Sequence, residues 1–560
     1  MQPFKKSKMN TIKNTVLLIA LSLGAVSCNN YLDINENPNS AHIEDVQPML
    51  IFPGAVTDLQ RVQTAGAQSM MDFGNLMMNS WGSNVYAFGG GFSREFTLST
   101  VDSSFYSGIW NTIYLQCANF KLIEDYPNGD HRQDYYVAMA KIMKAFYMQY
   151  IVDLYGDAPY TEAFLRNANQ TPKYDDDKNI YKALIGDLEN AIVLIDLQDS
   201  KAISPASTDV VFSGNMGKWK AFANTIKLRM LLRMSNLTSG EMAAYRDQKL
   251  ASLSGASFIN ENVVVNPGFT NTNDDKMNPI IVAYRVNSGI TVIPQNYNAI
   301  TASEHIAICL NGNKIGNVQP YSSEAFYSKF NNIVDPRSFR MFTAVTYQGS
   351  NQVKGVRQGA QTGQPGAPTD LTSTSRPGPG MFTNSTSVTS ANTVANLSSL
   401  ISAGNTRGAL VMSLAESKFL QAEAALRYPS LFSDAQNKFN EGIDASAAWF
   451  GTASSNINAY KQQISTRSGL GWLGTDAQKL EAIMTQKWLA LTNVSPTESF
   501  LDYLRTGYPY TPMSVIASTA NKPYRLMYPI SEYSANSANV PALSMNQLFS
   551  KNQYTPFWNQ

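Results

Sequence analysis

The sequence is poor in the residues that build metal centres and disulfide frameworks. Its 560 residues include only three cysteines and three histidines, with no CxxC, no HExxH and no cluster at zinc-ligand spacing. The sequence therefore predicts no structural zinc site. Cys117 falls on an apolar helical stripe between Trp110 and Phe120, which predicts a buried thiol. A Cys117–Cys309 disulfide is permitted in an exported protein, but nothing in the sequence requires it.

An excess of positive charge is also missing. The chain has 43 Lys+Arg against 42 Asp+Glu, and residues 1–27 hold four of the lysines and no acid, which leaves 39 against 42 beyond them. A nearly neutral body cannot neutralise many backbone phosphates, so we expect no nucleic-acid partner. The content of 44% hydrophobic and 15% charged residues is typical of a globular protein.

Catalytic motifs are absent as well. There is no G-x-S-x-G elbow and no P-loop, and His42, His131 and His305 lie in unrelated contexts. The sequence therefore predicts that the protein is not an enzyme. Acidic pairs occur as in any chain of this length, so a glycosidase pair of carboxylates remains the least favoured alternative.

The only long apolar run lies near the N-terminus. Four lysines precede Val16–Val26 (VLLIALSLGAV), a run too short to span the ~30 Å hydrocarbon core of a bilayer. Residues 1–27 are predicted to be a signal peptide. The following Ala25-Val26-Ser27-Cys28 fits a bacterial lipobox, although Leu is more usual than Ala25, and ordinary cleavage beside an incidental cysteine is the alternative. Lipidation of Cys28 with two or three acyl chains would anchor the protein stably to a membrane.

Helical periodicity dominates the rest of the chain. In Tyr135–Phe164 apolar residues recur at helical spacing, and Gly156 and Pro159 end the pattern, which predicts a core helix with one buried face that stops at Gly156. Similar stripes lie within 47–125, 184–195, Gly217–Met234, Leu410–Arg427, Ala435–Phe450 and Gln478–Leu491. The predicted fold is mainly α, with irregular tetratricopeptide-like helix pairs but no clean 34-residue period.

The pattern also predicts how the chain is divided. We expect one domain over 28–560, with a helical scaffold at about 45–255 and 408–500 and an irregular C-terminal segment at 501–560. A loop-rich, partly β region is expected at about 256–407, because residues 358–405 are dominated by Gly, Ser, Thr, Asn, Gln and Pro. Long loops on a rigid scaffold commonly carry binding residues.

Three acidic segments bear on metal binding. Asp33 to Glu44 places oxygen-bearing side chains at calcium-loop positions, but Pro38 stands where the turn needs glycine. Asp175-Asp176-Asp177 and Asp274-Asp275 are short runs that are more typical of solvated turns. Calcium is chemically possible at these runs, but we predict no metal and no cofactor.

Several segments, taken in their order along the chain, resemble the SusD/RagB family of nutrient-binding outer-membrane lipoproteins of Bacteroidota. The segments that carry the resemblance are the lipobox with Leu32-Asp33, Leu154 to Tyr160 (LYGDAPY), Lys218 to Asn224 (KWKAFAN), Asp335-Pro336-Arg337, Leu414-Ala415-Glu416, Gln486 to Leu491 (QKWLAL), Arg505 to Pro509 (RTGYP) and Arg525 to Pro529 (RLMYP). The resemblance implies a lipid-anchored protein on the outer membrane, facing the exterior, that passes a nutrient to a partner TonB-dependent (SusC-like) transporter. It also implies that the protein is not an enzyme.

A sugar site needs exposed aromatic rings beside amides. Trp81, Asn84, Tyr86 and Phe88 supply this combination in a Gly-rich stretch, and Trp81 and Asn84 resemble an aromatic-arc pair of some glycan-binding family members. The alternative is that Trp81 caps the core of the first helices. Weaker candidates are Tyr284, Tyr297 and Asn298, whereas Trp110, Trp219, Trp449 and Trp488 fall on helices and are predicted to be scaffold.

The predicted function is therefore capture of an oligo- or polysaccharide at the cell surface. Capture of a peptide or another nutrient is one alternative, and a transporter lid that binds no ligand is another. The sequence leaves open which nutrient is bound, which surface meets the transporter and whether the protein forms oligomers.

Overall fold

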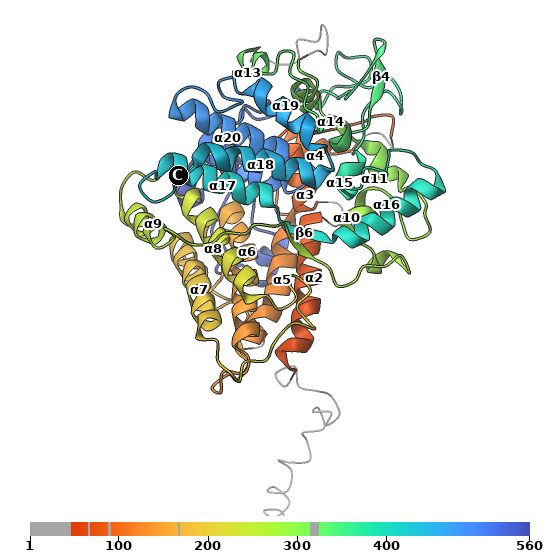
Figure 1. The fold of residues 1–560 in the computed structure, drawn as a ribbon. Coiled ribbons are helices and arrows are strands. Elements are labelled where there is room, and N and C mark those ends of the chain that lie inside the picture. Colours follow the sequence, from red (N-terminus) through yellow and green to blue (C-terminus); the bar gives the residue numbers. More distant parts are fainter. Residues whose placement is uncertain (1–45, 65–67, 88–90, 166–167, 314–323) are drawn as a thin grey trace, which may run out of the picture. The chain divides into compact units, whose positions relative to one another are not determined.

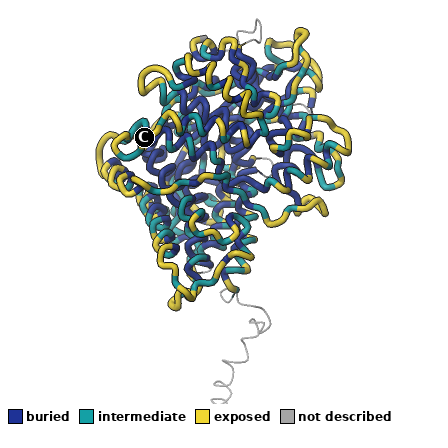
Figure 2. Tube along the Cα trace, viewed as in Figure 1, coloured by how far each residue is buried: buried dark blue, intermediate teal, exposed yellow. Residues whose placement is uncertain are grey.

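The computed structural model describes residues 46–64, 68–87, 91–165, 168–313 and 324–560, and most of its ordered elements are α-helices (Figure 1). The central helix α6 (Asp134–Tyr155) ends at Gly156, whose φ of +73° favours glycine, as the sequence predicts. The prediction of one buried face is wrong, because α2, α5, α7 and α8 pack around α6 and bury nearly all its residues. Figure 2 shows the buried residues filling the interior of this helical unit.

Most of the N-terminal helices pack as successive neighbours. They are α2 (Pro48–Thr64), α3 (Met70–Met77), α4 (Ser93–Thr97), α5 (Ser107–Glu124), α6, α7 (Asp177–Leu197), α8 (Met216–Arg233) and α9 (Glu241–Ala251). Contacts run from α2 to α5, from α5 to α6, from α6 to α7 and from α7 to α8, with α3 and α4 lying between α2 and α5 in the chain but outside this series. These helices thus stack pairwise, which is the arrangement of a helical repeat scaffold, although the connections between them vary in length.

The C-terminal helices continue the scaffold. They are α17 (Leu414–Arg427), α18 (Ala435–Phe450), α19 (Ser454–Ile464), α20 (Asp476–Leu491) and α21 (Pro496–Thr506). Helix α17 packs on α8, and α21 packs on α3, so helices from the two ends of the chain share one core. A Cβ at Gly442 would lie 2.8 Å from the Phe419 ring, so glycine permits the close approach of α18 to α17. The predicted mainly α fold is confirmed.

Buried ion pairs also connect the two helical groups. Arg233 of α8 lies 3.1 Å from Asp153 of α6 and 2.7 Å from Glu498 of α21. Its neighbour one turn earlier, Arg229, lies 3.4 Å from Glu416 of α17. All five side chains are buried. Because buried charges must be paired, this network restricts how the two groups of helices can pack.

The region 256–407 contributes three small antiparallel sheets. Strand β1 (Trp81–Ser83) pairs with β3 (Ile300–Ala302), β2 (Val263–Val265) with β6 (Ala409–Met412), and β4 (Val345–Tyr347) with β5 (Ser350–Gln352). Two of these sheets join a strand of this region to a strand outside it. The predicted partly β character is therefore limited to short strands, and two of the three sheets fasten the loop-rich region to the scaffold.

Helices, most of them short, occupy more of this region than the sequence indicates. They are α10 (Pro279–Tyr284), α11 (Pro294–Ala299), α12 (Glu304–Leu310), α13 (Glu324–Ser328), α14 (Ser338–Met341), α15 (Pro379–Phe382) and α16 (Val394–Arg407). The prediction of loops up to residue 405 is wrong at α16. There Thr393 caps the helix by accepting from the Asn396 amide, and Leu397, Leu400 and Ile401 bury one face.

The last segment is irregular and crosses the scaffold. It contains α22 (Ile530–Ala535) and the 3-10 turns η4 (Met545–Phe549) and η5 (Phe557–Asn559). The Leu526 amide donates to the Leu154 carbonyl at 2.7 Å, and the Tyr528 hydroxyl donates to the Asp157 carbonyl at 2.8 Å. These bonds attach the C-terminal segment to the end of α6.

Residues Pro48–Gln560 form one compact unit. Among the described residues, no helix combines the length and the apolar character needed to cross a membrane. Cys117 is buried, as predicted, and Cys117 and Cys309 are both free thiols. The predicted signal peptide, Cys28 and the Asp33–Glu44 pattern lie outside the described residues.

Candidate functional site

Trp81 lies in the hydrophobic core. Its side chain is 0% exposed, its indole N–H donates to Asn493 Oδ1 at 2.6 Å, and its ring meets the Tyr284 ring edge-on at 5.6 Å. A ring with no exposed face cannot stack on a sugar. The expectation of an accessible Trp81 is therefore wrong, and the alternative, a core residue, describes its position.

Asn84 is buried too and holds loops together. Its Nδ2 donates to the Asp370 carbonyl at 3.0 Å and to Thr374 Oγ1 at 3.2 Å, and its Oδ1 accepts from the Tyr86 amide at 3.0 Å. Tyr86 is 43% exposed. Phe88 lies outside the described residues. Tyr86 is thus the accessible aromatic ring of this predicted patch in the part that the structure describes.

The weaker candidates are mostly interior residues. The Tyr284 hydroxyl donates to Asp72 Oδ1 at 2.8 Å, and burial raises the pKa of that carboxyl to about 7. The buried Tyr297 ring lies 4.1 Å from the guanidinium carbon of Arg285, and Asn298 is half-buried. Tyr284 and Tyr297 therefore act in packing, and the structure does not bring the predicted residues into one accessible site.

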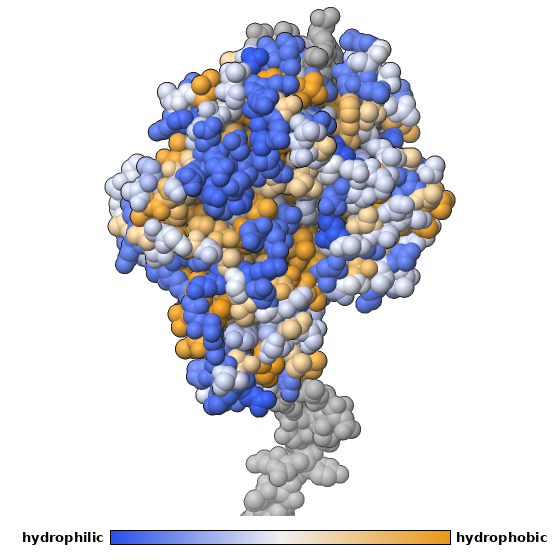
Figure 3. All heavy atoms as spheres, viewed as in Figure 1, coloured by the Kyte–Doolittle hydropathy of each residue, from blue (hydrophilic) through white to orange (hydrophobic). Residues whose placement is uncertain are grey.

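A cleft of about 420 Å³ lies between α18 and α19. This cleft, the α18–α19 cleft, is lined by Gln436, Phe439 and Asn440 of α18, by Asn458, Lys461, Gln462 and Ile464 of α19, and by Ser465 and Trp472. Its volume falls within the ~300–1,000 Å³ of typical small-molecule sites. Figure 3 shows hydrophilic residues gathered over the face on which Figure 1 draws α18 and α19.

Trp472 provides the aromatic wall. Its half-buried ring packs against Phe439, with ring centroids 5.4 Å apart, and Phe439 is fixed in turn against Phe419 at 6.1 Å. A Cβ at Gly471 would lie 2.0 Å from the Ile464 carbonyl oxygen, so the loop before Trp472 can approach the end of α19 only with glycine there. The fold therefore holds the ring in a defined place in the wall of the cleft.

The polar lining consists mainly of carboxamides. Gln436 and Asn440 are four residues apart on α18, and Asn458 and Gln462 are four apart on α19, so each pair shares a helix face. None of the four side chains has a hydrogen-bond partner among the described residues. An amide both donates and accepts, so these groups can pair with hydroxyls that do the same.

The charge in the cleft is balanced. Lys461 Nζ lies 2.6 Å from Asp444 Oδ1 and 2.8 Å from Oδ2, and Lys461 is the cleft's one charged lining residue within the described chain. An apolar ring, unpaired amides and no net charge together suit a neutral polyhydroxylated ligand.

The prediction from sequence missed this cleft. Trp472 follows a Gly-rich turn outside any helical stripe, a signal that could have marked it, as a similar signal directed attention to Trp81. The amide pairs at a spacing of four are a second signal, but polar residues at that spacing are common on exposed helix faces. Only the packing of α18 beside α19 shows that the two pairs face one cleft.

Comparison with known families is decisive for the class of protein. The family model of SusD-like proteins, described as starch-binding and associating with the outer membrane, matches residues 54–529. The chain belongs to the SusD-like family. This match confirms the resemblance noted in the sequence. The family's description also confirms that SusD-like proteins associate with the outer membrane.

Solved SusD-like structures share the fold. A SusD homolog from Bacteroides uniformis has a TM-score of 0.65 at 20% identity, covering 92% of this chain and 100% of that one. A chitin-binding SusD homolog from Flavobacterium johnsoniae has a TM-score of 0.63 at 20% identity, covering 87% of this chain and 94% of that one. A SusD-like protein from Bacteroides thetaiotaomicron has a TM-score of 0.58 at 20% identity, with coverage of 87% and 94%. A comparison with curated proteins finds no match.

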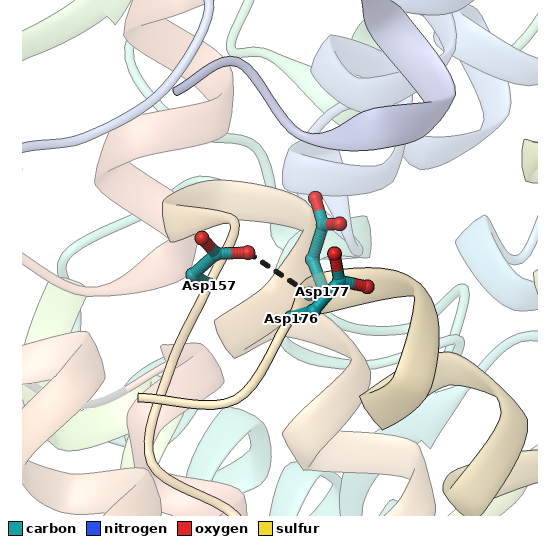
Figure 4. Close-up of side chains that lie close together, drawn as sticks. All are labelled: Asp157, Asp176 and Asp177. Carbon is teal, nitrogen blue, oxygen red and sulfur yellow. Dashed lines mark hydrogen bonds between the residues drawn. The ribbon is translucent and has the colours of Figure 1, made fainter. Parts of the chain in front are cut away.

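Three carboxylates also lie close together near the start of α7. One oxygen from each of Asp157, Asp176 and Asp177 lies within 4.8 Å of the others (Figure 4). Asp176 Oδ1 caps α7 by accepting from Lys178 N at 3.0 Å, and Asp177 Oδ2 accepts from Phe557 N at 2.7 Å. Burial and the neighbouring carboxylates raise the pKa of Asp177 to about 7.

Asp175, which the sequence grouped with this run, points elsewhere. Its carboxylate accepts from the Tyr160 and Thr161 amides, both at 2.8 Å. Asp274 accepts from the Ser288 amide at 2.7 Å. These acidic side chains are used as caps and turn anchors, and the expectation that no metal is bound stays a prediction.

Proposed function

We propose that the protein is a cell-surface lipoprotein that captures a neutral glycan in the α18–α19 cleft and passes it to a partner TonB-dependent transporter without cleaving it. The observation that carries the proposal is the half-buried Trp472 ring beside four carboxamides that have no partner among the described residues. Membership of the SusD-like family, whose description names starch binding, supports it. The likeness in fold to a chitin-binding relative supports it further.

The chemistry of the cleft favours sugars over charged nutrients. A pyranose presents an apolar C–H face that packs on an aromatic ring, and its hydroxyls need partners that both donate and accept. The Lys461–Asp444 pair adds a donor and an acceptor without net charge. Carboxamides also pair with peptide groups, so a peptide is the second ligand class to test.

Anchoring and delivery rest on the N-terminal sequence and on the family resemblance. The leader and the lipobox at Ala25–Cys28 support lipidation of Cys28. Attachment through acyl chains to the outer membrane, on its exterior face, would hold the cleft where external polysaccharide arrives. A lid that binds no ligand is the contrasting possibility for a scaffold of helix pairs.

Affinity electrophoresis through gels that contain a panel of plant, fungal and host polysaccharides tests the proposal. We expect one or more neutral polysaccharides to retard the protein, with no release of reducing ends. Release of reducing ends would show a glycosidase. Absence of retardation by every polysaccharide would contradict glycan capture and favour a peptide ligand or a lid without ligand.

A paired set of variants on α19 locates the binding surface. Asn458→Ala with Gln462→Ala removes two amides of the cleft, whereas Asn456→Ala with Gln463→Ala removes two exposed amides of the same helix that do not line it. At about 0.5–1.5 kcal/mol for each hydrogen bond, the first pair should weaken binding roughly 5- to 150-fold. The second pair should leave binding unchanged; equal effects would place the ligand elsewhere.

A further inference from the structure

A second cavity, of about 210 Å³, lies beyond the end of α21 and contains positive but no negative side chains. Its walls are the end of α21 with Tyr503, the loop residues Thr511, Lys522 and Tyr524, and Lys551 near the C-terminus. No aspartate or glutamate is among its described lining residues. This cavity is called the Lys522 cavity below.

Lys522 places a buried side-chain amine in the cavity, without a counter-ion among the described residues. The side chain is 6% exposed, its ammonium donates to the Pro512 carbonyl at 2.9 Å, and it takes part in no ion pair within the described chain. Burial lowers the pKa of Lys522 to about 7. A buried charge that lacks a partner is unfavourable, so a negative group in the cavity would stabilise the protonated form of Lys522.

A second buried polar group in the cavity is unsatisfied. Thr511 is only 5% exposed, and its hydroxyl oxygen has no hydrogen-bond partner in the described structure. An unpaired buried hydroxyl is unfavourable, and a bound ligand or water at the cavity is one way to satisfy it. Lys522 and Thr511 both line the cavity, so one bound oxyanion could satisfy both.

The cavity is built by ordered contacts. The Tyr524 amide donates to the Leu548 carbonyl at 2.7 Å, and Asn521 Nδ2 donates to the Phe549 carbonyl at 3.2 Å. The Pro512 carbonyl that receives Lys522 also receives Asn79 Nδ2 at 3.2 Å. These bonds fix Lys522 on one wall and bring the segment that carries Lys551 to the other.

We propose that the Lys522 cavity binds the carboxylate of a compact organic acid, with the tyrosine rings of Tyr503 and Tyr524 flanking its carbon skeleton. A singly charged group matches one buried ammonium, and Lys551 lies at the exposed rim. The cavity is smaller than the ~300–1,000 Å³ of sites for larger ligands, so it admits a single small unit rather than a chain. This site is independent of the α18–α19 cleft and of the neutral ligand proposed there.

The groups around Lys522 predict proton uptake on binding. The titratable groups that face it are Lys551, Tyr503, Tyr524 and His305, whose pKa burial lowers to about 3 and which is therefore neutral. A carboxylate beside Lys522 favours its charged form and raises its pKa. Above pH 7 the empty cavity holds Lys522 largely neutral, so binding takes up a proton and weakens as the pH rises further.

Isothermal titration of the full-length protein with D-glucuronate and with acetate at pH 7.5 tests the proposal. Using two buffers of different ionisation enthalpy measures proton uptake directly, and D-glucose is the neutral control. We expect at least one carboxylate to bind with uptake of part of a proton, and any binding of glucose, which the α18–α19 cleft would supply, to occur without proton uptake. Absence of binding by both carboxylates would overturn the proposal, and so would equal binding of inorganic sulfate, because the class of ligand would then be wrong.

Three variants locate the binding. Lys522→Met removes the buried ammonium and should weaken carboxylate binding roughly tenfold or more and abolish the proton uptake. Lys173→Met is the control: it removes a lysine that lies outside the cavity and has a 79% exposed side chain, so it should change neither carboxylate binding nor proton uptake. Thr511→Val keeps the shape and should weaken binding less than Lys522→Met does. Undiminished binding and proton uptake in Lys522→Met would overturn the assignment.

Discussion

Arg233 occupies the centre of the buried ion-pair network, and its replacement tests how the two groups of helices are held together. Its guanidinium lies 3.1 Å from Asp153, 2.7 Å from Glu498 and 3.5 Å from Asp502. Burial alone would lower the pKa of Arg233, but these three carboxylates outweigh it and raise the pKa. Arg233→Met would fill a similar volume but leave three buried carboxylates without this partner.

The expected loss is large. Removing one partner of a buried ion pair costs about 3–5 kcal/mol, because the remaining charge stays buried without compensation. The entropy of unfolding is about 2.1 cal/mol/K for each residue, so the unit Pro48–Gln560 should unfold with about 1.1 kcal/mol/K. Dividing the expected loss of stability by this entropy predicts a fall in Tm of about 3–5 °C for Arg233→Met.

Calorimetry at pH 7 measures this fall, with Lys220→Met as the matched control on the same helix. Lys220 lies 2.7 Å from Asp196, but both side chains are about half exposed, so its loss should cost under about 1 kcal/mol. Arg233 also holds the pKa of Glu498 low, and this stabilising pairing weakens as the pH falls. The difference in Tm between the wild type and Arg233→Met should therefore become smaller as the pH is lowered toward 4. Equal effects of the two variants at pH 7 would refute the reasoning.

Three further substitutions test individual sites. Gly471→Ala places a Cβ against the Ile464 carbonyl, so we expect calorimetry to show a loss of about 1–3 kcal/mol in the free energy of unfolding. Polysaccharide gels should also retain the variant less. Unchanged retention would show that the Trp472 loop does not position the ligand. Asp177→Asn should raise Tm at pH 8 but not at pH 4. The pKa of Asp177 is raised to about 7, so the folded state loses stability as the pH rises toward and through 7, and the uncharged amide avoids this loss. A fall in Tm at pH 8 would contradict this sign. Trp81→Ala should cost about 3–5 kcal/mol in chemical unfolding as a core truncation, and a small loss there would contradict its burial.

The helical scaffold follows closely from local sequence. The stripe and the Gly156 stop define α6 to within a residue or two, because periodicity and end signals are both local. Helix α16 escaped the prediction, since its apolar residues Leu397, Leu400 and Ile401 are diluted by Ser, Asn and Gly, and composition outweighed the spacing. The burial of α6 on all sides also depends on which helices surround it, which the pattern does not contain.

The binding surface was much less predictable. Trp81 stands in a Gly-rich stretch that looks exposed, but its partner Asn493 is 412 residues away, and only the folded chain brings them together. The cleft residues Asn440 and Asn458 are unremarkable singly and gain meaning only when α18 and α19 face each other. Stripes and caps are local signals, whereas a site made from two helix faces is a tertiary property.

The most direct test of the account is the affinity of the retained polysaccharide for Trp472→Ala compared with Tyr86→Ala. Both variants remove an accessible aromatic ring, one from the α18–α19 cleft and the other from the Gly-rich patch. We expect Trp472→Ala to lose roughly 2 kcal/mol or more of binding free energy, about 30-fold in affinity, with Tyr86→Ala close to wild type. Full affinity in Trp472→Ala with a loss in Tyr86→Ala would contradict the assignment of the cleft.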